Sequence, residues 1–176
     1  MERKSNKERI HIADFNPDVT SLKIAHQDFF NEMQSFNAGE GYQNFKDFIL
    51  EEAEEYRDTG DGATYVVWNV IYDETGAEQT REIVSFYTLA TTAIPYEDRI
   101  RLDADEAKEL GKEFDSQICV IPALEIKMFA VDEKYQDLFY EYQGEDLPIS
   151  AWIMRSIVAY ANELINDIVG FKAIFL

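Results

Sequence analysis

The chain has 176 residues, of which 46% are hydrophobic, a size and composition that predict one domain with one buried core. Its formal net charge is −19, and because a phosphate backbone is bound through clustered Lys and Arg, we expect no nucleic-acid partner. The sequence contains neither a run of roughly 20 apolar residues that would cross a bilayer nor a signal peptide, so we expect a cytoplasmic protein with no membrane partner.

The first part of the chain predicts one strand and two helices. Residues 9–15 are typical of a strand, which the Asn-Pro-Asp sequence that follows would end as a turn. Apolar residues at helical spacing predict helices over residues 21–33 and 43–57. The four glutamates of the second helix spread around its outer face, which favours a solvated surface over a cation site.

An antiparallel hairpin is predicted next. Residues 64–72 (TYVVWNVIY) and 82–92 (EIVSFYTLATT) are rich in β-branched and aromatic side chains, and residues 73–76 supply the turn. The Gly-containing segment 58–62 before the hairpin lacks the alternating ligands and closing Glu of a calcium loop. It is therefore interpreted as a connector.

Residues 95–117 are a polar excursion between strands. A short helix is expected within it, and its acidic first turn (Asp103, Asp105 and Glu106) agrees with the helix dipole. The same three acids suggest a metal cluster, but no histidine is near, so we expect no metal site. Cys119, the only cysteine, excludes an intramolecular disulfide and is expected to be a small core residue.

The most informative stretch is residues 121–156. An apolar strand over residues 123–131 leads into a polar loop, and an amphipathic helix begins near Pro148 and runs to about Val169. A strand, a loop and a helix N-terminus form the geometry that binds anions, because free amide groups and the helix dipole converge there. The final segment, FKAIFL, is predicted to be a strand.

At this stretch the chain resembles the GCN5-related N-acetyltransferases, the GNAT family. The two halves of that family's acyl-CoA motif are matched by Val131, Asp132, Tyr135 and Gln136, and by Ile149, Ser150, Ile153 and Met154. The segments YTLATTAIP and IPALEIKMFAVD are also similar to a bacterial branch of the family that includes toxin-type acetyltransferases. The resemblance covers most of the chain from Phe45 onward.

The resemblance implies an α+β fold with α/β/α layers, in which a mixed, mostly antiparallel sheet is splayed between its fourth and fifth strands. Acetyl-CoA, as cosubstrate, would lie in that gap. The backbone of Phe129, Ala130 and Val131 would pair with its pantetheine arm, and the amides of Ile149, Ser150 and Ala151 would hold its pyrophosphate. Gln136 would also belong to the cofactor-binding residues.

The activity implied is acyl transfer from acetyl-CoA to a small amine or a protein amine, with the acidic charge disfavouring a tRNA-linked acceptor. Glu125, on the same strand, is the expected proton acceptor. The interpretation of Glu125 as a half-exposed structural residue that faces Lys127 is at least as well supported as a role as proton acceptor.

Two departures from the family pattern leave an alternative open. Residues 137–148 separate the two motif halves, carry four acids and no Lys or Arg, and end at Pro148, which has no N–H to donate. The usual last helix and two strands are missing after residue 176, so we expect a single truncated domain or a homo-oligomer that completes the sheet edge. The alternative function is a catalytically degenerate GNAT-fold interaction protein with an acidic surface.

Overall fold

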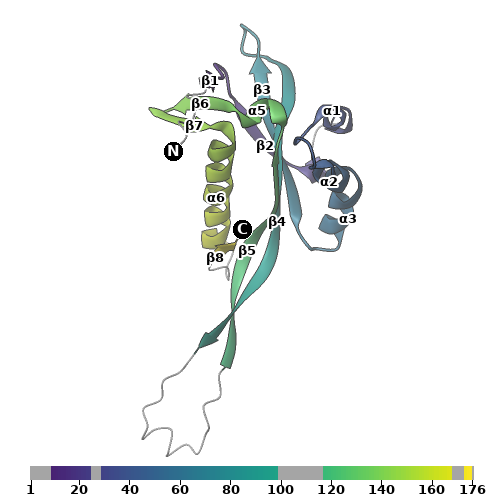
Figure 1. The fold of residues 1–176 in the computed structure, drawn as a ribbon, viewed down its shortest axis with the longest axis vertical. Helices are drawn as coiled ribbons and strands as arrows, with labels where there is room; N and C mark the ends of the chain where they lie inside the picture. Colours follow the sequence, from purple (N-terminus) through teal and green to yellow (C-terminus); the bar gives the residue numbers. More distant parts are fainter. Residues whose placement is uncertain (1–8, 25–28, 99–116, 168–172, 176) are drawn as a thin grey trace, which may run out of the picture.

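A five-stranded sheet with the order β2-β3-β4-β5-β8 forms the centre of the molecule and separates two layers of helices (Figure 1). The structure is a computed structural model that describes residues 9–24, 29–98, 117–167 and 173–175. The strands are β2 (Pro17–Ser21), β3 (Ala63–Tyr72), β4 (Glu78–Asp98), β5 (Gln117–Val131) and β8 (Ala173–Phe175). Pairing is antiparallel except between β5 and β8, which run parallel. The predicted α/β/α layering and the mixed, mostly antiparallel sheet are confirmed.

The helices cover the sheet from both sides. One face carries the 3₁₀ turn Leu22–Ile24, α1 (Phe29–Ser35) and a continuous helical stretch made of α2 (Gln43–Asp47), a π-helical turn (Phe48–Glu52) and α3 (Ala53–Asp58). The other face carries α6 (Ile149–Asp167). The first layer packs around Phe29, Trp68 and Phe86, while the second packs around Val67, Ile153 and Ile157. The sheet therefore has two apolar faces, as a three-layer fold requires.

The predicted hairpin is confirmed as β3 and β4. Asp73 organises its turn by accepting hydrogen bonds from the amides of Thr75 (2.8 Å) and Ala77 (3.0 Å), and Gly76 takes the positive φ of 81° that the turn needs. Strand β4 is longer than predicted because it continues, paired with β5, to Asp98. The short helix and the acids expected after residue 98 lie outside the described residues.

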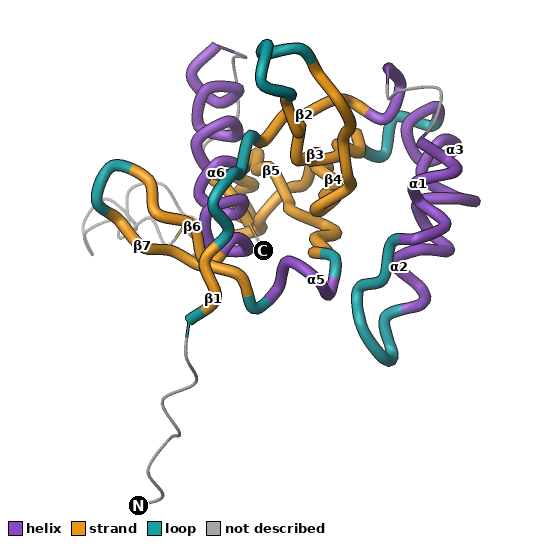
Figure 2. The backbone as a smooth tube through the Cα atoms, turned by 90° about the horizontal axis from the view of Figure 1, so that it is seen from above, coloured by secondary structure: helices purple, strands orange, loops and turns teal. Residues whose placement is uncertain are grey.

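A second, small sheet stands beside the N-terminus of α6 and has the order β1-β6-β7 (Figure 2). It consists of β1 (Ile10–His11), β6 (Leu138–Tyr142) and β7 (Glu145–Pro148). The segment expected to be a polar loop thus contains a hairpin, and a short helix, α5 (Glu133–Gln136), precedes it. Gln143 and Gly144 form its turn with φ angles of 54° and 81°.

The N-terminal prediction is corrected in two places. Only Ile10–His11 of the expected first strand is extended in a ladder, and it joins the small sheet. The main sheet instead begins at Pro17–Ser21, where a turn and a helix start were expected. Pro17 is tolerated because it is the first residue of an edge strand, where a missing donor leaves no ladder bond unmade.

Candidate functional site

Within the described part of the chain, one edge of β5 has no paired strand beyond Glu125, and this stretch is called the open edge. Strand β8 (Ala173–Phe175) pairs with Ala123–Glu125, whereas β5 continues to Val131. The amide of Asp132 donates to the carbonyl of Val84 in β4 at 2.8 Å, and in an antiparallel ladder such bonded positions alternate. We infer that the backbone groups of Ala130 form hydrogen bonds with Phe86 in β4, whereas those of Phe129 and Val131 point away from β4, toward the open edge.

A β-bulge interrupts β5 just before this edge. Thr88 pairs with Met128 and Leu89 pairs with Ile126, so Lys127 is an extra residue without an opposite partner in β4. The bulge shifts the side-chain alternation, since Ile126 and Phe129 both pack on the α6 side. Bulges re-aim side chains in this way at functional sites.

Glu125 and Lys127 lie on the face covered by α1–α3. The Lys127 ammonium lies 4.8 Å from the centroid of the Tyr56 ring in α3, and its hydrogen bond with Tyr56, helped by the nearby carboxylate of Glu125, raises the pKa of Lys127. Glu125 is partly exposed and pairs in the sheet with Ala90 and Phe175. The expected neighbour of Glu125 is therefore present, which is compatible with either interpretation of this residue.

The short helix α5 uses its own hydrogen-bonding groups internally. Asp132 caps it by accepting from the amide of Lys134 at 3.0 Å. The amide of Tyr135 bonds to the Asp132 carbonyl at 2.9 Å, and the amide of Glu133 bonds to the Asn37 carbonyl at 2.6 Å. These amides are therefore engaged with protein acceptors and are not directed at a ligand.

Gln136 is also engaged. Its Nε2 donates to the carbonyl of Val131 at 2.9 Å and to the carbonyl of Ala38 at 3.0 Å. The side-chain amide of this expected cofactor-binding residue thus joins the open edge of β5 to the loop between α1 and α2. Figure 2 shows α5 lying beside that loop.

The N-terminus of α6 lies directly after the small sheet. Ile149 is fully buried in the core, and Ser150 and Ala151 are partly exposed. Pro148 ends β7 and pairs with Phe139 of β6, so the residue without an N–H donor occupies a ladder position. The predicted helix is confirmed to Asp167, with Ile153 and Ile157 buried as expected.

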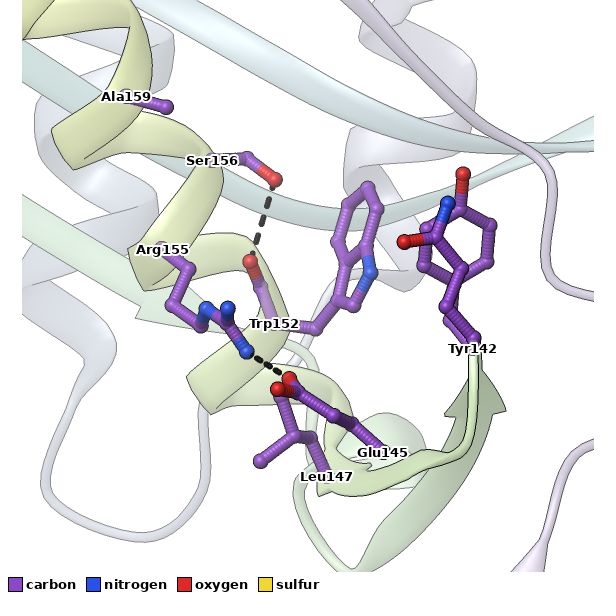
Figure 3. Close-up of a pocket in the computed structure, with 8 residues that line it drawn as sticks. Tyr142, Glu145, Leu147, Trp152, Arg155, Ser156 and Ala159 are labelled. Atoms are coloured by element: carbon purple, nitrogen blue, oxygen red, sulfur yellow. Dashed lines mark hydrogen bonds and ion pairs between the residues drawn. The ribbon is translucent and has the colours of Figure 1, made fainter.

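Basic side chains outside the hairpin pair with its carboxylates Asp146 and Glu145. Arg9 binds Asp146 at 2.7 Å and His11 lies 3.1 Å from the same carboxylate, and their hydrogen bonds lower the pKa of Asp146. Glu145 forms an ion pair with Arg155 of α6 (Figure 3). The region near the α6 N-terminus is thus less repulsive to an anion than the sequence of the hairpin alone indicates.

Three hollows meet at Trp152. One, of about 310 Å³, lies between the hairpin and the flank of α6 (Figure 3). A second, of about 330 Å³, lies between α6 and the β2–β4 part of the sheet, where Tyr65 stacks on Tyr87 at 5.1 Å. The third, of about 620 Å³, extends over Phe15 and Tyr140. Aromatic side chains therefore line a continuous side of the molecule next to the α6 N-terminus.

Within the described ranges, no cluster of three or more His, Cys, Asp or Glu side chains is arranged to hold a metal ion. No described helix is long and apolar enough to span a membrane.

Comparison with known proteins identifies relatives by structure alone. No protein-family model matches the sequence. A search of curated protein sequences likewise gives no match. Among solved structures, a mutant of the AtaT toxin is similar over 95% of this chain and 77% of its own, with a TM-score of 0.53 and 14% identity. A mutant of KacT is similar over 90% and 75%, with a TM-score of 0.51 and 14% identity. AtaTR bound with AcCoA is similar over 90% and 73%, with a TM-score of 0.51 and 12% identity.

These structures correct one expectation drawn from charge. AtaT has also been solved in complex with acetyl-methionyl-tRNAfMet, and KacTA in complex with DNA. The expectation that the chain has no nucleic-acid partner is therefore wrong as an inference from net charge, because net charge does not describe a local binding surface. The toxins that match have the GNAT fold. Structure and motifs agree, and this chain has the fold of the GCN5-related N-acetyltransferases.

Proposed function

We propose that the protein is an N-acyltransferase that transfers the acetyl group of acetyl-CoA to an amine. The observation that carries the proposal is the open edge of β5, where the backbone groups of Phe129 and Val131 point away from β4. After α5 and the β6–β7 hairpin, the chain continues into α6, whose N-terminus is the proposed anion-binding element. A protein of the same fold, AtaTR, has been solved with AcCoA, which supports this choice of cosubstrate.

The binding groups follow from this geometry. A peptide-like pantetheine arm pairs with Phe129 and Val131 as an added strand would. The amides of Ile149, Ser150 and Ala151 face the pyrophosphate with the positive end of the α6 dipole. Ala130 and Gln136, which the motif also suggests, have other partners and contribute by shaping the edge.

In the chemical step, the lone pair of the amine attacks the thioester carbonyl, the carbon–sulfur bond breaks, and the thiolate leaves. The amine must lose a proton, and Glu125 is the carboxylate on the same strand that can accept it, directly or through water. Most of the rate enhancement comes from holding the amine against the thioester.

The direct test is calorimetric titration with acetyl-CoA. The wild-type protein is expected to bind with a dissociation constant in the micromolar range. Ala151→Trp, which places a ring at the first turn of α6, is expected to weaken binding about tenfold or more, equivalent to about 1.4 kcal/mol. Ala159→Trp, two turns later on an exposed part of the same helix, serves as the matched control and is expected to bind normally.

A second candidate function is a GNAT-fold interaction protein that no longer binds a cofactor. It is favoured by one observation, the internal use of the α5 amides of Glu133, Lys134 and Tyr135. The same titration separates the two functions, because this candidate requires the absence of binding heat at millimolar acetyl-CoA with a folded protein.

A further inference from the structure

A cluster of hydrogen bonds fastens the loop between α1 and α2 to the turn that follows β5. The amide of Asn37 donates to Asp132 Oδ2 at 3.0 Å, and the side-chain amide of Asn37 donates to Glu133 Oε2 at 2.7 Å. Gln136 adds the bond to the Ala38 carbonyl at 3.0 Å. Together with the 2.6 Å bond from the Glu133 amide, the clamp joins segments that are about 95 residues apart in sequence.

Asp132 is the centre of this clamp. It is buried, and its two carboxylate oxygens accept from different amides. Oδ1 caps α5 by accepting from the amide of Lys134, and Oδ2 accepts from the amide of Asn37. Two backbone donors on one carboxylate form charge-assisted bonds, which are stronger than neutral ones. The loop is thus held by a group that lies one residue beyond the open edge of β5.

Gln136 links the clamp to the edge itself. Its Nε2 bridges the carbonyl of Val131, which lies on the edge, and the carbonyl of Ala38, which lies in the loop. This one side chain therefore connects the edge directly with the loop. The loop also contains the positive-φ glycines Gly39 and Gly41, and the amides of Gly39 and Tyr42 add hydrogen bonds within the loop to these outside contacts.

We propose that Asp132 and Gln136 are positioning residues that couple the order of loop 37–42 to occupation of the β5 edge by acetyl-CoA. This inference rests on the proposed function. When the pantetheine arm pairs with Phe129 and Val131, it stiffens the carbonyl that Gln136 holds, and the loop becomes more ordered. Coupling is reciprocal, so loosening the loop must weaken acetyl-CoA binding by the same factor.

The test combines hydrogen exchange with calorimetry, using acetyl-CoA as the probe. The amides of Asn37, Gly39 and Tyr42 are hydrogen-bonded, so their exchange reports opening of the loop. In the wild-type protein, saturating acetyl-CoA is expected to slow exchange in residues 37–42 at least about fivefold, the lower range of measured couplings.

Asp132→Asn is the decisive variant. Asn is isosteric with Asp and keeps the α5 cap through Oδ1. Its NH2 group replaces Oδ2, so the Asn37 N–H faces a donor instead of an acceptor. We expect faster exchange in the free protein, loss of the acetyl-CoA effect on residues 37–42, and acetyl-CoA affinity lowered about fivefold or more. Gln136→Leu is expected to act in the same direction.

Lys134→Met is the matched control, because Lys134 lies on the same short helix but its side chain binds Glu82 at 2.9 Å, away from the loop. It is expected to leave both measurements within twofold of the wild type. Acetyl-CoA binding without any change in exchange of residues 37–42, or Asp132→Asn with unaltered affinity, overturns the coupling alone. Absence of binding heat in the wild-type protein rejects the coupling and the proposed function together.

Discussion

The hydroxyl groups of Thr64 and Thr88 lie 2.9 Å apart across β3 and β4, and both residues are buried. One hydroxyl thus donates to the other where water is excluded. Thr88→Val is expected to lower the free energy of unfolding by about 1–3 kcal/mol, because it leaves the Thr64 hydroxyl buried without its partner. The double variant Thr64→Val with Thr88→Val should regain much of that loss. Chemical denaturation of the four proteins measures the coupling, and additive losses would contradict the account.

A glycine is required where α3 approaches the sheet. A Cβ added to Gly62 would lie 2.7 Å from Tyr56 Cε1 and 2.8 Å from the Leu89 carbonyl oxygen, and no positive φ is involved. Gly62→Ala is therefore expected to destabilise the protein by about 1–3 kcal/mol through overpacking. It should also displace Tyr56 from Lys127, which near-ultraviolet circular dichroism can detect. An unchanged melting temperature would show that the backbone there adjusts freely.

Alkaline pH is expected to destabilise the protein through buried tyrosines. Burial raises the pKa of Tyr87 and of Tyr135, and the bond from Tyr135 to Glu82 at 2.7 Å raises the latter further. Because the folded-state pKa is raised, the stability is fully present below the unfolded value of about 10 and is lost as pH rises above it, by up to about 1.4 kcal/mol per pH unit for each group.

Urea unfolding between neutral and alkaline pH checks this dependence. Tyr87→Phe removes one titrating group and should flatten the decline above pH about 10. Tyr72→Phe changes an exposed tyrosine and should leave the profile as it is in the wild type. An identical profile in Tyr87→Phe and wild type would assign the alkaline loss to other groups.

The ion pair between Arg155 and Glu145 is expected to matter more for binding than for stability. Both side chains are exposed, so Arg155→Glu should change the free energy of unfolding by no more than about 1 kcal/mol. The same change places an additional negative charge beside the first turns of α6 and should weaken acetyl-CoA binding, more at low than at high salt. Lys46→Glu, on α2 across the sheet, alters net charge equally and should have little effect.

Substitution of Glu125 distinguishes a chemical role of this residue from a structural one. If it accepts the proton of the amine, Glu125→Gln should lower kcat about 100-fold or more, with acetyl-CoA affinity unchanged. The measurement is release of free CoA thiol with a panel of primary amines. Lys127→Met removes the positive charge next to Glu125 and is the control for a purely local electrostatic effect. Equal kcat in Glu125→Gln and wild type would leave Glu125 as a sheet residue.

Patterns confined to one element were predictable from the sequence. The β-branched run over β3 and the repeat of Ile149, Ile153 and Ile157 along α6 are set by periods of two and 3.6, which local sequence encodes directly. The motif halves on either side of the hairpin were sufficient to identify the GNAT fold. The fold therefore follows from local information, whereas the place of the site stays a prediction.

The β6–β7 hairpin was missed although its sequence contains a signal. Tyr140 and Tyr142 alternate with Phe139 and Glu141, and Gln-Gly follows as a turn. Its acidic charge favoured a loop interpretation, because the partners of those acids could not be known. Arg9 and Asp146 are 137 residues apart, and no local pattern indicates that they meet. The engagement of Gln136 with Ala38 is equally non-local.

The small sheet beside α6 also constrains how the molecule is made. His11 in β1 contacts Asp146 in β7, 135 residues later, so this contact forms only after those residues have been synthesised. At a synthesis rate of about 5–20 residues per second, that interval is on the order of ten seconds. Closing so long a loop costs conformational entropy that a two-residue ladder offsets only weakly. We therefore expect the small sheet next to the α6 N-terminus to assemble later than the β3–β4 hairpin and to open more readily than that hairpin.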